Sequence, residues 1–222
     1  MSVTITYLGH SGFLLSDGQH TLAVDPFLTG NPKAVHRPED IVCDSIALTH
    51  GHEDHVGDTL AIAKANDAQV FAPFELCNWI NEQGHAKTVP GNPGGRIETV
   101  FGHVSFTPAI HSSSYQGRYM GAACGIVFRL GEVTLYHLGD TALQGDFEIT
   151  RKIAEPDVCM IPCGDRFTMG PKLATMAAEM LKPQIAIPIH YDTWPEIEVD
   201  ICEFAPREVD VKVMKPGDTL RV

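Results

Sequence analysis

The sequence predicts a mixed α/β fold in which two β-sheets are covered by helices on their outer faces. Apolar and polar residues first alternate as they do in strands, then the apolar period changes from two to 3.6, and strands and helices return in the second half. The chain has 222 residues, of which 44% are hydrophobic and 20% charged, so it can bury a sizeable core. We therefore expect one four-layered domain over residues 1–222.

The first half of the chain predicts four strands, then a helix, a short strand and a second helix. The turn Asp17-Gly18 separates two of the strands, and Asp58 offers an N-cap for the first helix, in which apolar residues recur at helical spacing. The predicted strands are Val3–Leu8, Gly12–Ser16, Thr21–Asp25, Ser45–Thr49 and Gln69–Ala72, and the predicted helices begin near Asp58 and span Phe74–Glu82.

The second half returns to strands and then alternates helices with strands. Gly102-His103 and Leu130-Gly131 are the expected turns, and Pro171 suits the first position of a helix because its missing N–H would have no partner there. The predicted strands are Ile97–Phe101, Val104–Pro108, Cys124–Leu130, Val133–Leu138, Val158–Pro162, Ile185–Ile189, Val209–Val213 and Thr219–Val222, and the helices are Gly145–Ala154 and Pro171–Leu181.

The composition excludes several classes of partner. With 16 basic and 28 acidic residues the formal net charge is −12, and nucleic acids and anionic membranes are bound mainly through Lys and Arg. No apolar run approaches the length of about 18 residues that a membrane span needs, and the first residues lack the pattern of a signal peptide. We expect a cytoplasmic protein whose six cysteines, scattered in apolar segments, are buried reduced thiols.

The segment THGHEDH, which begins at Thr49, directly follows an apolar strand. It therefore forms the loop at the carboxyl end of that strand, where α/β folds collect reactive groups. Its three imidazoles and the carboxylate of Asp54 are ordinary ligands of a borderline divalent ion. His50 and His52, two apart in extended chain, face the same side and can chelate one ion. Asp54 and His55 project differently, so they offer ligands for a second ion.

Three further candidate ligands stand at the ends of apolar strands, far away in the sequence. A lone histidine at such a position is more often a satisfied structural residue, but three together with the THGHEDH loop form a coherent pattern. The candidates are His111 after Phe106–Ile110, Asp140 after Leu135–Gly139 and His190 after Ile185–Ile189.

These motifs resemble those of the metallo-β-lactamase superfamily. THGHEDH is similar to its His-x-His-x-Asp-His signature, and His111, the triplet Gly139-Asp140-Thr141 and His190 match its later ligand motifs in order. YLGHSGFLL, VDPFLTGNP, MGPKLATMAAEML and IPIHYDTWP resemble a small branch of metal-dependent hydrolases that is similar to ascorbate-phosphate lactonase and N-acyl-phosphatidylethanolamine phospholipase D. The resemblance implies an αββα sandwich with metal ions at one edge.

The resemblance also implies which residues hold the ions. His50, His52 and His111 would hold the first ion, Asp54, His55 and His190 the second, and Asp140 would bridge both. We expect two divalent ions, with zinc favoured and manganese or iron permitted. Two ions about 3.5–4 Å apart share a water and lower its pKa to about 7. The nucleophile would then be a metal-bridging hydroxide, with Asp54 and Asp140 as the catalytic carboxylates.

The sequence indicates less clearly which side chains orient the metal ligands. His10 and Asp25 stand at strand ends and are candidates, although Asp25 could instead cap the turn before Pro26. His137 could face the site or be buried and structural. Arg118 could bind a substrate anion through its bidentate guanidinium, or it could be solvated or structural.

The expected function is a hydrolase that cleaves a small ester, lactone or phosphodiester bond. Two divalent ions would make the site locally attractive to anions, so a small anionic substrate remains compatible with the net charge. The alternatives are a nuclease, which the charge disfavours, and an iron-dependent redox enzyme of the same superfamily. Apolar edge strands also permit a homo-oligomer.

Overall fold

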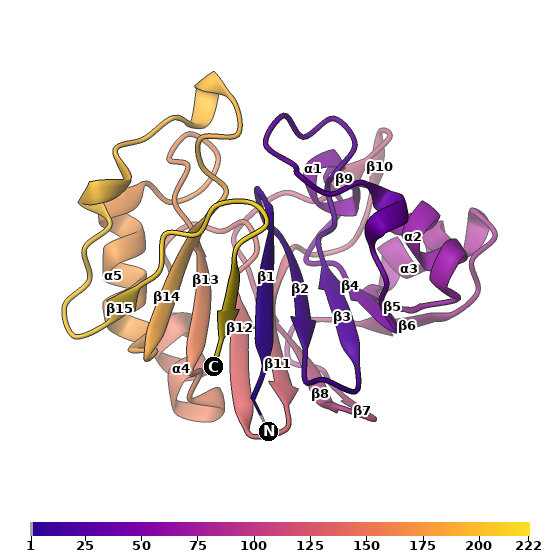
Figure 1. Ribbon diagram of the computed structural model, residues 1–222, viewed down its shortest axis with the longest axis horizontal. Coiled ribbons are helices and arrows are strands. Elements are labelled where there is room, and N and C mark those ends of the chain that lie inside the picture. Colours follow the sequence, from indigo (N-terminus) through magenta and orange to yellow (C-terminus); the bar gives the residue numbers. More distant parts are fainter. Residues whose placement is uncertain (1) are drawn as a thin grey trace.

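Two seven-stranded β-sheets pack face to face in the computed structural model, which describes residues 2–222 (Figure 1). The first sheet contains the N-terminal strands and is completed at one edge by the last strand of the chain. Strands β1 to β3 are antiparallel, whereas β3 to β6 are parallel. In spatial order this sheet consists of β16 (Thr219–Arg221), β1 (Thr4–Gly9), β2 (Gly12–Ser16), β3 (Thr21–Val24), β4 (Ser45–Ala47), β5 (Gln69–Pro73) and β6 (Thr88–Gly91).

The second sheet mirrors the first in its mixture of strand directions. Strands β7, β8, β11 and β12 are antiparallel neighbours, and β12 to β15 are parallel. In spatial order this sheet consists of β15 (Asp210–Val211), β14 (Ile185–Ile189), β13 (Val158–Pro162), β12 (Val133–His137), β11 (Cys124–Leu130), β8 (Gly102–Pro108) and β7 (Arg96–Thr99).

Helices cover the outer face of each sheet, so the predicted four-layered α/β arrangement is confirmed. Figure 1 shows α2 and α3 on one outer side and α4 and α5 on the other. No helix within residues 2–222 combines the length and the apolar character that a bilayer crossing requires. The helices are α1 (Glu53–Val56), α2 (Thr59–Asn66), α3 (Phe74–Glu82), α4 (Asp146–Ala154) and α5 (Pro171–Leu181), with 3-10 turns η1 (Pro38–Asp40), η2 (Pro195–Ile197) and η3 (Ile201–Glu203).

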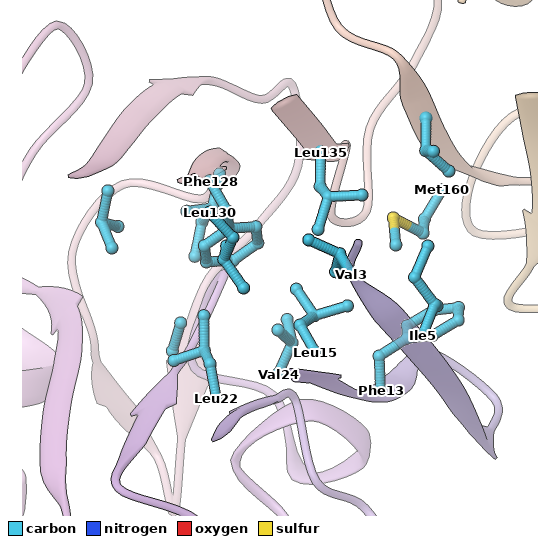
Figure 2. Packing of buried hydrophobic residues seen from close by; sticks show 14 of the residues in the cluster. Val3, Ile5, Phe13, Leu15, Leu22, Val24, Phe128, Leu130, Leu135 and Met160 are labelled. Atoms are coloured by element: carbon cyan, nitrogen blue, oxygen red, sulfur yellow. The ribbon is translucent and has the colours of Figure 1, made fainter. Parts of the chain in front are cut away.

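Three apolar clusters hold the four layers together. The largest lies between the sheets and includes Phe13 and Leu15 of β2 and Phe128 and Leu130 of β11 (Figure 2). A second cluster fills the space between the first sheet and α2 and α3, and a third fills the space between the second sheet and α4 and α5. Burial of apolar side chains on both faces of each sheet is the main driving force for this arrangement.

Some short elements and boundaries differ from the sequence prediction. Strand β6 has the sequence TVPG, whose Pro and Gly disfavour strands, and it forms only as an edge strand paired with β5. Helix α1 has four residues, too few for a periodic signal. The hairpin of β9 (Ser114–Tyr115) and β10 (Arg118–Tyr119) has two-residue strands and was likewise not predicted.

Two further expectations are corrected by the structure. Gly102 begins β8 rather than forming a turn, because β7 already ends at Thr99 and the turn falls at Val100-Phe101. Cys202 is exposed, since it lies in the short 3-10 turn η3 on the surface, whereas the other five cysteines are buried as free thiols.

Strands of both sheets point toward the same end of the sandwich. Among them, β1, β3 and β4 run in one direction within the first sheet, and β8, β12 and β14 do within the second. The ends of β1 and β14 are joined by a hydrogen bond of 2.8 Å from His190 N–H to the His10 carbonyl. The loops that follow these strands therefore meet at one edge, which is where α1 and the β9–β10 hairpin lie in Figure 1.

Candidate metal centre

The loop after β4 and the short helix α1 present four candidate ligands. His50 is buried and His52 stands at the N-cap of α1 in extended backbone, so the two rings lie on the same side with centroids 4.6 Å apart. Asp54 and His55 belong to the first turn of α1 and project elsewhere. The sequence predicted that the pair His50 and His52 would project differently from the pair Asp54 and His55 within a loop. In the structure the short helix α1 produces this difference.

His50, His52 and His111 form the first group of ligand atoms, all within 4.8 Å of one another. His50 Nε2 lies 2.9 Å from His52 Nδ1, and the second nitrogen of His52 lies 3.3 Å from the Ser112 hydroxyl. Burial lowers the pKa of each of the three imidazoles. They are therefore held neutral, which is the form that binds a metal ion.

A second group combines Asp54, His55 and His190, and it also includes His10. Asp54 Oδ2 is central to it, at 3.0 Å from His10 Nε2, 3.5 Å from His190 Nε2 and 3.9 Å from His55 Nε2. His10 and His190 also pack against each other, with ring centroids 4.2 Å apart. The structure thus brings a fourth side chain to a group for which the resemblance implied three.

Asp140 lies between the two groups. Its buried Oδ2 is 3.0 Å from His190 Nε2, 3.4 Å from His55 Nε2, 3.5 Å from His111 Nε2 and 4.0 Å from His50 Nε2. Burial alone would raise the pKa of Asp140, but the imidazoles of His190 and His55 hold it well below its usual value. Burial opposes the charged form of His190 as well, yet Asp140 and Asp54 raise its pKa to about 9.

Three buried polar atoms of the centre have no hydrogen-bond partner within residues 2–222. They are His55 Nε2, Asp140 Oδ1 and His190 Nδ1. Unpaired buried polar atoms are costly in a folded protein, and a divalent ion bound by imidazole and carboxylate would satisfy the first two. The donor set of the centre therefore fits divalent metal ions.

Asp25 holds His55 from the side away from Asp140. The His55 Nδ1–H donates to Asp25 Oδ2 over 2.7 Å, and Thr49 donates to the same carboxylate from its hydroxyl at 2.6 Å and its N–H at 2.9 Å. Because Nδ1 carries the proton, Nε2 keeps its lone pair toward the centre. Sequence reasoning left Asp25 open between an orienting role and a turn cap, and its buried carboxylate contacts His55 directly.

His10 is held on three sides within the second group. Its Nδ1 lies 2.8 Å from the Thr193 hydroxyl, its Nε2 donates to Asp54, and the Trp194 indole stacks on the ring at 4.9 Å. Burial lowers the pKa of His10 to about 4. Sequence reasoning did not single out Thr193 or Trp194; the available signal was that they follow His190 closely in a loop at the same sheet edge.

Three residues of the centre have a left-handed backbone. They are His10 at φ 57°, Asp25 at φ 42° and His190 at φ 55°. Such conformations cost about 1–3 kcal/mol each for residues other than glycine and cluster at functional sites. The surrounding hydrogen bonds and packing therefore stabilise backbone turns that aim these side chains into the centre.

His137 and Arg118 lie outside the two groups. His137 Nε2 donates to the Ser11 carbonyl at 2.9 Å and so links the two sheets, and its Nδ1 accepts from the Gly139 N–H at 3.1 Å within the segment that follows β12. The exposed Arg118 is bidentate to Glu82, at 2.5 and 3.2 Å. Its guanidinium fork is thus occupied by a carboxylate of this chain.

Two hollows flank the centre, one on each side of the β9–β10 hairpin. The first, of about 610 Å³, reaches Asp54 and is also lined by Tyr115 of the hairpin. The second, of about 510 Å³, reaches His111 and is lined by the neighbouring Ser114. Volumes of this size accommodate small-molecule ligands. A molecule bound at the centre could extend into either hollow.

Replacing Gly51 with alanine is expected to weaken metal binding. The added Cβ would overlap the Met120 side chain, so the loop that carries His50 and His52 must move. We expect about 10- to 100-fold lower metal affinity, as for the loss of an orienting contact, measured by competition with a chromophoric chelator. Gly145→Ala is the matched control, because nothing lies near its Cβ, and equal affinities of the two variants would contradict this expectation.

A sandwich of two mixed sheets with histidines and aspartates gathered at one edge defines the class of metal-binding αββα proteins. A family model described as the β-lactamase superfamily domain matches residues 4–190. A "UPF0173 metal-dependent hydrolase" of Carboxydothermus hydrogenoformans is 44% identical over 96% of this chain and 97% of its own length. One from Bacillus cereus is 43% identical over 97% of this chain and 98% of its own length. The chain therefore belongs to the UPF0173 metal-dependent hydrolases of the metallo-β-lactamase superfamily.

Solved structures agree with this assignment. A metallo hydrolase from the archaeon Ignicoccus hospitalis superimposes with a TM-score of 0.92, at 30% sequence identity, over 100% of this chain and 99% of that one. The predicted resemblance to the superfamily and the predicted fold are thereby confirmed, and the chain is a metal-dependent hydrolase.

Proposed function

We propose that this hydrolase cleaves a small ester, lactone or phosphodiester bond with two divalent ions, zinc being the favoured metal. The observation that carries the proposal is the position of Asp140, whose Oδ2 lies within 4.0 Å of imidazoles from both ligand groups. One carboxylate that reaches both groups is the arrangement a dinuclear centre needs.

In this proposal each of the two groups of ligand atoms holds one ion. Neutral imidazoles of the first group would hold one ion, the second group with its carboxylate would hold the other, and Asp140 would contact both. Bound divalent ions polarise a carbonyl or phosphoryl oxygen and lower the pKa of a water to near neutrality. In this proposal the ligands are His50, His52 and His111 for the first ion and Asp54, His55 and His190 for the second.

The residues around the ligands set their orientation and handle the proton. Asp25 keeps the lone pair of His55 Nε2 directed into the centre, and His10 fixes the Asp54 carboxylate by donating to its Oδ2. Asp54 also lines the first hollow. Its carboxylate is therefore in a position to accept a proton from an attacking water.

The test is turnover of a panel of small esters, lactones and phosphodiesters by protein loaded with zinc or manganese. We expect at least one class to be hydrolysed, with activity lost in a chelator and in His52→Ala. His103→Gln is the control, because His103 lies at the start of β8, the end opposite to the centre. Activity that survives both the chelator and His52→Ala, or a folded, metal-loaded protein that cleaves nothing in the panel, would refute the proposal.

A further inference from the structure

The hollow on the Asp54 side is walled by aromatic rings and carboxylates. Trp194 is fixed by stacking on His10 and by an edge contact with Phe27, whose ring centroid lies 6.2 Å away. The rings are thus held in place before any ligand enters. We call this space the aromatic-acidic hollow; its aromatic residues are Phe27, Tyr115 and Trp194, and its acidic residues besides Asp54 are Glu53 and Asp58.

The negative charge that Glu53 and Asp58 bring to this hollow is not balanced by a lysine or an arginine within residues 2–222. No lysine or arginine lines it, and within residues 2–222 Glu53 forms no ion pair with one. Asp58 accepts hydrogen bonds of 2.9 and 2.8 Å from the N–H groups of Leu28 and Thr29, which are neutral and leave its charge in place. Partial burial and the charges of Glu53 and Asp58 raise the pKa of Tyr115.

We propose that the aromatic-acidic hollow receives a small alkylammonium group of the substrate while the scissile bond lies at the metal centre. The inference rests on the proposed function and specifies the substrate class of the same site. A cation is attracted both by the faces of aromatic rings and by the carboxylates, whereas an anion is repelled. The net charge of −12 on the whole chain adds to the attraction at long range.

Two features indicate that this group is cationic rather than merely apolar. A neutral alkyl group would be satisfied by the rings alone and would leave Glu53 and Asp58 without a counterion. The neighbouring hollow around His111 is lined mainly by small residues and by Arg118, whose charge Glu82 already occupies. The two hollows therefore differ in charge and shape, and the cation belongs on the Asp54 side.

Binding of matched ligands to the metal-loaded protein tests the inference without requiring any hydrolysis. Choline and 3,3-dimethylbutan-1-ol have the same shape but differ in charge, and their dissociation constants can be measured by calorimetry. We expect choline to bind about tenfold more tightly. Equal affinities of choline and the neutral alcohol would overturn the proposal.

Variants assign the preference to this hollow. Glu53→Gln, at an exposed position, should reduce choline affinity about threefold and leave the affinity for the neutral alcohol unchanged. Trp194→Leu should remove most of the tenfold preference, provided that circular dichroism shows a folded protein. Glu132→Gln removes an exposed carboxylate outside the hollow and should change neither ligand. A preference that is the same in all three variants would place the cation elsewhere and refute the proposal.

Hydrolysis of a matched pair separates this inference from the proposed function. A choline ester and the 3,3-dimethylbutyl ester of the same acid should differ about tenfold in kcat/KM, in favour of choline. If neither ester is cleaved but choline still binds preferentially, ester hydrolysis fails while the cation site stands. If both are cleaved at equal rates and bind equally, the hydrolase stands and the cation site falls.

Discussion

Asp140→Asn is expected to reduce turnover to less than about 1% of the wild-type rate. Its carboxylate lies within 4.0 Å of His50 and within 3.5 Å of His55, His111 and His190, so it serves both ligand groups. Loss of a partner that only orients a ligand typically costs about 10- to 100-fold in metal affinity or activity, and a shared ligand must cost more. Asparagine keeps the shape but removes the charge that would balance the proposed ions.

Steady-state kinetics and metal analysis of the same preparation check this result. We expect the asparagine variant to retain fewer than two ions per chain. Asp25→Asn is the comparison, because Asp25 contacts His55 but lies behind it, and there we expect only the smaller loss of about 10- to 100-fold. An Asp140→Asn enzyme that holds two ions and keeps a tenth of its activity would show that Asp140 is not shared.

The fold was predictable from the sequence wherever the apolar pattern was long enough. Strands β2, β11, β13 and β14 and helices α3 and α5 have the predicted boundaries, because five or more residues of one period identify an element. The shorter elements β6, α1 and the β9–β10 hairpin carry too few residues for a period to emerge. They form because pairing and packing with neighbours override weak local preferences.

The candidate ligands were predictable because each follows an apolar strand. What the sequence could not specify is that β1, β8 and β14 point to the same edge, since direction depends on which strands pair. That pairing brings His10 and His190, which are far apart in the sequence, into contact. Contacts made by loop residues, such as the one between the Thr193 hydroxyl and His10, result from the same strand pairing. The spacing of residues in the sequence does not indicate them.

The ion-pair partner of Arg118 is another contact that the sequence does not indicate. The sequence placed an arginine near His111 and left open whether it binds an anion, and nothing near it along the chain identifies Glu82, which lies in α3. The ion pair arises because the β9–β10 hairpin lies beside the end of that helix. It occupies the guanidinium that lines the hollow beside His111, whereas the cation site proposed above rests on the residues of the other hollow.

Removal of the metal ions is expected to lower Tm by about 5–16 °C without unfolding the protein. Ligands that bind only the folded state stabilise it by about 2.7 kcal/mol at 100 times Kd and about 4.1 kcal/mol at 1,000 times Kd. In a chain of this length each kcal/mol shifts Tm by about 2–4 °C. The three apolar clusters do not involve the ligands, so the stripped protein should keep a cooperative core.

Thermal unfolding with chelator, and again after adding back zinc or manganese, measures the effect. His190→Ala removes a proposed ligand that contacts both Asp54 and Asp140, so its Tm should respond much less to added metal than the wild type does. His103→Gln should respond fully. Identical transitions with and without metal would mean that the buried atoms His55 Nε2 and Asp140 Oδ1 are not satisfied by an ion, because an ion bound there must stabilise the folded chain.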